Sequence, residues 1–267
     1  MRSKISVTIM ILSTLFISGC NSLINHMTFH PDRGVLPAEQ LPANVQDVCF
    51  KTDDGIEIHS YYLEKPSSRR ILIYFHGNAG NISHRLTDLI KIHSFNINVL
   101  GVSYRGYGKS QGKPSEDGIY KDGKAALEYA TRVLGYDPGN VVVLGRSIGA
   151  SVAIHISQNI DLGGLILVTP LTSAKEYARA TGLGWLSPLA GNSFNNIGKI
   201  GNVVCPTLVV HGNKDNVVPL DMGREVFEKS VAEKRFVEIE GAGHNDLSTT
   251  YRAMYWSPIH EFLVDSE

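Results

Sequence analysis

The sequence alternates short apolar runs with stretches of helical pattern, and this alternation limits the folds that are open to it. The apolar runs are continuous and rich in β-branched residues, which is typical of strands buried on both faces of a parallel sheet. Five such runs are residues 71–75, 97–102, 141–144, 165–168 and 207–210. An intervening stretch, residues 115–134, begins with Ser115 as a candidate N-cap and has acidic residues in its first turn. Strands that alternate with helices predict a wound α/β sheet.

Composition excludes several classes of protein. Hydrophobic residues make up 43% of the 267 residues, which is enough to bury a core and excludes a disordered chain. The 25 basic and 26 acidic residues leave no positive excess to neutralise phosphates, so we expect no nucleic-acid partner. Three cysteines are too few for a disulfide scaffold or a Cys-rich metal module. No third ligand lies near His26 and His30, so we expect neither a metal nor another cofactor.

The folded domain is predicted to begin at residue 45. Residues 45–52 and 56–63 flank Asp53-Asp54-Gly55, which predicts a hairpin at the edge of the sheet. Upstream, residues 20–44 contain three prolines and little periodicity, which is typical of a tether. No second linker and no internal repeat follow, so we interpret residues 45–267 as one domain.

Residues 1–19 are predicted to be a signal peptide. Arg2 and Lys4 precede residues 5–17, a 13-residue stretch without charge that is too short to span a bilayer as a helix. Ile17-Ser18-Gly19-Cys20 resembles the lipobox of bacterial lipoproteins, which implies that Cys20 is acylated and becomes the mature N-terminus. An ordinary cleaved signal and an uncleaved anchor are the alternatives. Asn21 implies, by the same resemblance, a lipid-anchored protein of the cell envelope, on the outer membrane and facing the periplasm.

Two segments match the pattern G-x-S-x-G of nucleophilic serines, and their flanks distinguish them. The pattern needs a strand directly before the serine and a helix directly after it. Ser147 follows the apolar run 141–144 and opens residues 148–157, an apolar stretch of helical length. Ser110 follows no apolar run and is soon followed by Pro114. Ser147 is therefore the candidate nucleophile, and Ser110 is interpreted as a turn residue.

Candidates for the base and the acid lie downstream of Ser147. A serine hydroxyl becomes nucleophilic when a histidine accepts its proton and a carboxylate orients that histidine, and the chain order at such a turn is serine, acid, histidine. His244 lies downstream of every predicted strand, and Asp215 follows the run 207–210. Asp246 is the alternative acid, but its position two residues after His244 favours a role in shaping that loop.

Two backbone N–H groups are expected to stabilise the oxyanion of the reaction. One comes from the residue after the nucleophile, Ile148, and the other from the loop after the third strand, where Asn78 is the candidate. His76 and His211 each precede a glycine at a strand end, and we interpret both as structural.

Five motifs occur in a fixed order: FHGNAGN at 75–81, YRGYG at 104–108, PSEDG at 114–118, GRSIG at 145–149 and GHND at 243–246. Together they resemble the α/β-hydrolase superfamily, and in particular the branch that contains the ABHD-type protein depalmitoylases and their bacterial relatives. The resemblance covers about residues 45–265. It implies a mostly parallel eight-stranded sheet with helices on both faces, a Ser-His-Asp triad, and a short cap insertion, residues 170–204, over the nucleophile. Export would separate this chain from cytosolic palmitoylated proteins, so depalmitoylation is not carried over.

The predicted activity is hydrolysis of small-molecule carboxylic esters or thioesters through an acyl-enzyme. A serine peptidase of the aminopeptidase type and a non-catalytic envelope lipoprotein that binds partners are the alternatives, and the complete candidate triad favours catalysis. Apolar residues of the cap either pack the cap onto the domain or line an acyl pocket, and the small cap favours short to medium acyl chains. They are Leu171, Tyr177, Leu183, Trp185, Leu186, Leu189 and Phe194.

Overall fold

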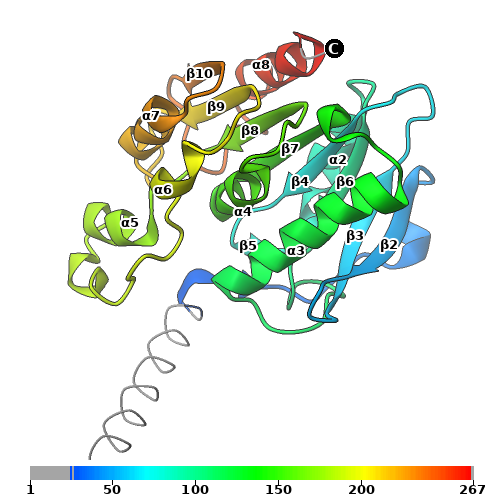
Figure 1. The fold of residues 1–267 in the computed structure, drawn as a ribbon, viewed down its shortest axis with the longest axis horizontal. Helices are drawn as coiled ribbons and strands as arrows, with labels where there is room; N and C mark the ends of the chain where they lie inside the picture. Colours follow the sequence, from blue (N-terminus) through cyan, green and yellow to red (C-terminus); the bar gives the residue numbers. More distant parts are fainter. Residues whose placement is uncertain (1–24, 26, 266–267) are drawn as a thin grey trace, which may run out of the picture.

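The computed structural model describes Asn25 and residues 27–265, and an eight-stranded sheet forms its centre (Figure 1). The strand order is β10-β9-β8-β7-β4-β6-β3-β2, and β3 runs antiparallel to both of its neighbours while the other pairs are parallel. The strands are β2 (Val45–Lys51), β3 (Glu57–Leu63), β4 (Ile71–Phe75), β6 (Asn98–Val102), β7 (Val141–Arg146), β8 (Gly164–Val168), β9 (Thr207–Gly212) and β10 (Lys234–Ile239). The mostly parallel wound sheet and its edge hairpin, predicted from the sequence, are confirmed.

Helices cover both faces of the sheet, because the central strands are apolar on both sides. In β4, Ile71, Ile73 and Phe75 belong to one core, and Leu72 and Tyr74 belong to the other; none of the five is exposed. The first core is covered by α3 (Glu116–Glu128), α4 (Ile148–Ser157), α6 (Ile197–Ile200) and α7 (Leu220–Lys229). The second core is covered by α2 (Leu86–His93) and α8 (Arg252–Asp265). Short helical turns complete the chain: η1 (Ala38–Gln40), η2 (Ile82–Arg85), η3 (Tyr129–Val133) and η4 (Pro138–Asn140).

Serine side chains cap the starts of two helices, and the cap at Ser115 confirms the predicted helix start. The Ser115 hydroxyl accepts from the N–H of Gly118 at 3.1 Å and caps α3. In the cap, the Ser173 hydroxyl accepts from the N–H of Glu176 at 3.1 Å and caps α5 (Ala174–Ala180). The cap continues through η5 (Gly184–Leu186) to α6, and Figure 1 shows α5 standing apart from the sheet.

Part of the segment predicted to be a tether, residues 20–44, is packed against the domain. Phe29 is buried beside Phe194 of the cap, with ring centroids 6.3 Å apart. His30–Pro31 forms a short strand, β1, parallel to β5 (Ala79–Gly80). From residue 28 onward the segment is therefore part of the folded domain, because one aromatic anchor and backbone pairing hold it in place.

The predicted signal peptide and Cys20 lie outside the described residues. Within the described residues, no helix combines the length and the apolar character needed to cross a membrane. Cys49 of β2 and Cys205, just before β9, are both free thiols.

Candidate active site

Four loops at one edge of the sheet carry the predicted site residues. Asn78 follows β4, Ser147 follows β7, Asp215 follows β9 and His244 follows β10. These four strands run parallel, so their carboxyl ends meet at the same edge, where ligands bind on sheets of this kind.

Ser147 occupies a sharp turn between β7 and α4. Its φ of 55° and ψ of −119° place a non-glycine residue in a strained region of backbone conformation. The flanking glycines permit this turn: a Cβ on Gly145 would lie 2.3 Å from the carbonyl oxygen of Gly149, and a Cβ on Gly149 would lie 2.3 Å from that of Phe75. The strand, turn and helix predicted around Ser147 are confirmed.

His244 and Asp215 form a buried hydrogen-bonded pair. His244 Nδ1 lies 2.7 Å from Asp215 Oδ2, and the Asp215 side chain is fully buried. The N–H groups of Val217 and Val218 donate to Asp215 Oδ1, each at 2.8 Å. Burial opposes ionisation of this carboxyl, but hydrogen bonds from His211 and His244 outweigh it and hold the pKa of Asp215 below its usual range. Asp215 is therefore an ionised acceptor that orients the His244 ring.

Arg146, the last residue of β7, ties the His244 loop to the turn at Ser147. Its guanidinium donates to the carbonyl oxygen of His244 at 2.7 Å and to Asn245 Oδ1 at 3.3 Å. Asp246 accepts from a backbone N–H of the same loop at 2.8 Å, which is the shaping role predicted for it. Among the described residues, no hydrogen bond joins the Ser147 hydroxyl to His244; such bonds often tighten only when substrate binds.

The candidate oxyanion residues flank the Ser147 turn. Ile148 begins α4, so its N–H is among the helix-terminal donors without a partner inside the helix. The Asn78 loop comes close on the other side, since a Cβ on Gly77 would lie 3.7 Å from Ser147 Cβ. The side-chain amide of Asn78 donates from Nδ2 to the carbonyl oxygen of Thr28 at 3.2 Å, which joins this loop to the N-terminal segment.

Two tyrosines of the loop after β6 also hold the Asn78 loop in place. Tyr104 donates to the carbonyl oxygen of His76 at 2.8 Å, and Tyr107 donates to the carbonyl oxygen of Asn78 at 2.6 Å. Burial raises the pKa of both phenols, so they remain protonated donors. The tyrosines of the YRGYG motif therefore support the loop that carries Asn78.

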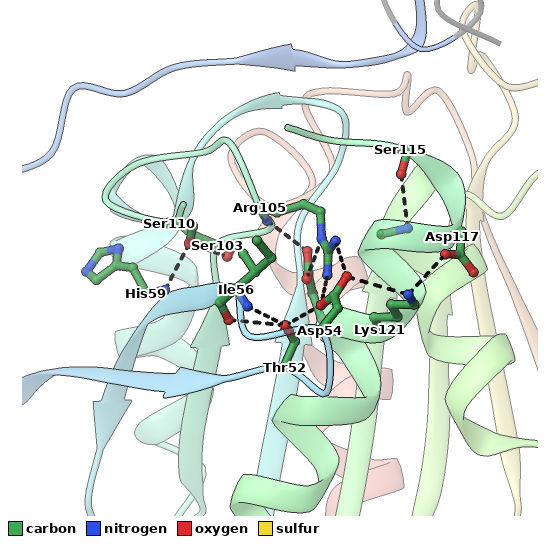
Figure 2. A network of polar contacts seen from close by, with 12 residues as sticks. Thr52, Asp54, Ile56, His59, Ser103, Arg105, Ser110, Ser115, Asp117 and Lys121 are labelled. Atoms are coloured by element: carbon green, nitrogen blue, oxygen red, sulfur yellow. Dashed lines mark hydrogen bonds and ion pairs between the residues drawn. The ribbon is translucent and has the colours of Figure 1, made fainter. Parts of the chain in front are cut away.

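The loop after β6, residues 103–115, is called the tyrosine loop. A network of polar contacts anchors it to the rest of the domain (Figure 2). Arg105 donates from its backbone N–H and from Nε to Asp122 of α3, both at 2.8 Å, and from its terminal nitrogens to Asp54 of the edge hairpin at 3.0 and 3.1 Å. Ser110 is fully buried, donates to a backbone carbonyl oxygen at 2.8 Å and accepts from the N–H of His59 at 2.9 Å. The second G-x-S-x-G match is thus structural, as the sequence indicated.

An apolar cavity of about 210 Å³ opens beside Ser147. Ser147, Ile148 and Asn78 lie in its wall together with apolar side chains from three parts of the chain. The cap contributes Leu171, Ala174, Tyr177, Ala178, Leu183, Leu189, Ala190 and Phe194, the N-terminal segment contributes Met27 and Thr28, and the loop after Asp215 contributes Val217 and Val218. A serine in the wall of an apolar cavity suits a substrate with an apolar group next to the bond that reacts.

Relatives among curated proteins cover most of the chain. An uncharacterized protein of Mycobacterium tuberculosis is 31% identical over 246 residues, which span 90% of this chain and 87% of the relative. Human alpha/beta hydrolase domain-containing protein 17B is 33% identical over 204 residues, which span 74% of this chain and 69% of the human protein. The chain belongs to the α/β-hydrolase family. No protein-family model matches it.

Solved structures agree with this α/β-hydrolase assignment at the level of the fold. An esterase from Pyrococcus furiosus superimposes with a TM-score of 0.77 at 21% identity, over 89% of this chain and 98% of that one. An α/β-hydrolase from Vibrio vulnificus gives a TM-score of 0.71 at 20% identity, over 82% and 81% of the two chains. The family resemblance predicted from the sequence motifs is confirmed.

Sequence reasoning missed three contributions to the site of this α/β-hydrolase. Met27 and Thr28 fall within the predicted tether, although the neighbouring Phe29, a large aromatic residue, is a signal of packing. The contacts of Val217 with Asp215 and the cavity depend on the conformation of a loop that has no periodic pattern. Arg146 occupies a variable position of the nucleophile pattern, so nothing in that pattern indicates its contact with His244.

Two further buried histidines lie near the α/β-hydrolase site, and one of them, His211, also contacts Asp215, with 3.5 Å between His211 Nε2 and Asp215 Oδ2. His76 Nδ1 lies 2.7 Å from the carbonyl oxygen of Gly77, and burial lowers the pKa of His76 to about 3, so the ring is neutral. His211 Nε2 lies 2.9 Å from the carbonyl oxygen of Val218. Across the part of the chain that the structure describes, no three His, Cys, Asp or Glu side chains are grouped to hold a metal ion.

Proposed function

We propose that this chain is a serine hydrolase that cleaves carboxylic esters or thioesters through Ser147, His244 and Asp215. One observation carries the proposal: Ser147 lies on a strained strand-to-helix turn in the wall of an apolar cavity, and the hydrogen-bonded pair His244 and Asp215 is tied to that turn. A nucleophile, an oriented base and an acyl-sized cavity at one edge of the sheet are the parts that acyl transfer requires.

In the proposed reaction, Ser147 Oγ attacks the acyl carbonyl carbon while His244 Nε2 takes the hydroxyl proton. Ionised Asp215 accepts from Nδ1–H, which leaves Nε2 free to act as the base and stabilises the imidazolium that forms. The N–H groups of Asn78 and Ile148 stabilise the oxyanion. The imidazolium then gives its proton to the departing alcohol or thiol, which leaves an acyl-enzyme on Ser147. His244 next takes a proton from water, the water oxygen attacks the acyl carbonyl carbon, and the proton passes to Ser147 Oγ as the acid is released.

The size of the cavity supports the proposal that the substrates carry short to medium acyl chains. At about 210 Å³ it is smaller than the roughly 300–1,000 Å³ of pockets that hold drug-sized ligands. Cap residues such as Leu171 and Phe194 line it, which favours the acyl-pocket interpretation of the cap over simple packing. Each methylene that fits contributes up to about 0.8 kcal/mol, or nearly fourfold in kcat/KM, until the cavity is full.

A series of aryl esters from acetyl to palmitoyl tests this function. We expect kcat/KM to rise over the first additions of methylene and then to fall, with the maximum at a short or medium chain. Ser147→Ala should lower turnover by about 10⁴-fold and should not react with a fluorophosphonate probe, since triad members act as a unit. A maximum at long chains, undiminished labelling of Ser147→Ala, or aminopeptidase turnover without ester cleavage would contradict the proposal.

We also propose that the hydrolase is anchored to the cell envelope through a lipid on Cys20, at the outer membrane and facing the periplasm. The lipobox-like Ile17-Ser18-Gly19-Cys20 and the following Asn21 support this location. The domain would then act on substrates close to a membrane surface.

A further inference from the structure

The rim of the cavity is exposed and apolar. Met27, Leu183 and Leu189 line the cavity, yet they are 44%, 38% and 38% exposed. Trp185, in η5 between the two cap leucines, is 76% exposed. We call these four residues the rim. An exposed tryptophan among aliphatic residues is unusual on a surface that faces only water, and it suits a boundary between water and lipid.

The segments that carry the rim also lack charge. No Asp, Glu, Lys or Arg occurs in residues 21–31 or in residues 180–198. At the chain's average of 19% charged residues, 30 residues would contain about six. Burying the rim in a lipid surface would therefore desolvate no charged side chain of these segments, which is the main cost that normally opposes such burial.

A lipid on Cys20 would bring the rim close to a membrane. Met27 lies seven residues after Cys20, and seven residues span at most about 25 Å when fully extended. A lipid on Cys20 would thus hold Met27 within that distance of the bilayer.

We propose that the rim docks on the lipid bilayer, so that the cavity beside Ser147 opens toward the membrane. Trp185 and the aliphatic rim side chains enter the interfacial region, and an acyl group dissolved in the bilayer reaches the cavity without crossing water. The access of substrate rests on the function proposed above, whereas the docking itself does not depend on catalysis.

Tryptophan fluorescence of the full chain tests the docking, because the sequence has only two tryptophans and Trp256 is 5% exposed. The chain is reconstituted into phosphatidylcholine vesicles with plain or brominated acyl chains, the latter quenching tryptophans that enter the bilayer. We expect brominated lipid to quench the wild type and to leave Trp185→Phe, which reports Trp256 alone, almost unquenched. Equal fractional quenching of the two proteins would overturn the proposal.

Matched substitutions show whether the rim itself causes the contact. Leu189→Asp should lose most of the quenching of Trp185, whereas Val133→Asp, at an exposed apolar residue of η3, should keep it. If Trp185 is shielded from both brominated lipid and aqueous iodide, a segment of this chain or a second copy covers the rim and the proposal fails. Hydrolysis of a soluble aryl ester, measured on the same wild-type sample, reports the proposed function separately, because quenching needs no turnover.

Discussion

In the proposed reaction, Asp215 determines how His244 can act. Its Oδ1 accepts two backbone N–H groups at 2.8 Å, so the carboxylate is fixed before it meets the imidazole at 2.7 Å. An asparagine can keep the backbone contacts through its own Oδ1, but it then presents an NH₂ group to His244 Nδ1. That group favours the tautomer in which Nε2 carries the proton and cannot act as a base. Asp215→Asn should therefore lower kcat by about 10³- to 10⁴-fold while the protein stays folded.

The control for this prediction is Asp246→Asn, in the loop that carries His244. Asp246 Oδ1 accepts a backbone N–H at 2.8 Å, which an asparagine oxygen can also accept. We expect kcat within about threefold of the wild-type value for this variant, since neutral and charged acceptors differ modestly in a loop contact. Steady-state kinetics of both variants on one aryl ester decide the matter, and a larger loss in Asp246→Asn would assign the acid to Asp246 instead.

Single residues of the site differ in how far the sequence predicts them. Ser147 and Asp215 could be selected because each follows an apolar run, and His244 because it lies downstream of every predicted strand. The three also obey one chain order. The contact of Arg146 with His244 joins residues 98 positions apart and has no local signal. Contacts of this kind are fixed by tertiary packing, which a pattern along the chain does not encode.

At the scale of elements, the tyrosine loop after β6 positions the proposed oxyanion donor of Asn78. Tyr107→Phe removes the hydroxyl that donates to the Asn78 carbonyl oxygen at 2.6 Å and leaves the ring in place beside His76. The Asn78 loop then keeps the N–H of His30 as a donor to that oxygen. Since oxyanion donors act on the transition state, we expect kcat to fall roughly tenfold with KM little changed.

Tyr136→Phe is a matched control for the tyrosine loop. The Tyr136 hydroxyl lies 3.0 Å from that of Tyr62, before β7 and therefore at the opposite edge of the sheet from Ser147. Loss of this contact should lower the free energy of unfolding by about 1 kcal/mol and leave kcat unchanged. Urea unfolding and steady-state kinetics compare the two variants. Similar kinetic losses in both would mean that Tyr107 contributes only to stability.

The strands and helices could be predicted where side chains carry the signal, and not where the backbone does. The sequence predicts β4 because all five of its residues are apolar. It predicts α3 because Ser115 and an acidic first turn mark the start of a helix. β1 has only two residues, both exposed, and pairs with β5 through backbone groups. The periodicity that identifies strands is absent in so short an element, so the sequence pattern predicts a tether for this N-terminal segment.

At the scale of the whole molecule, the proposed chemistry and the proposed membrane contact share one region. The cavity lies between the strand ends, the cap and the first described residues, and Met27 belongs to both the cavity wall and the exposed rim. The N-terminal segment thus links the Asn78 loop to the chain that leads back to Cys20. If Cys20 carries a lipid, the apolar rim can add a second contribution to membrane attachment.

The lipid anchor is the last prediction and concerns the whole chain. In cells given labelled fatty acid, the wild type should incorporate label, whereas Cys20→Ala lacks the thiol that accepts the lipid and should incorporate none. The wild type should also sediment with membranes, because an acyl chain contributes about 0.8 kcal/mol per buried CH₂. Cys49→Ala is the control, since Cys49 is an exposed thiol within the described domain and should not affect labelling. Equal label in the wild type and Cys20→Ala, or its loss in Cys49→Ala alone, would place the lipid elsewhere. The rim would then have no anchor seven residues away, and docking would depend on its apolar side chains alone.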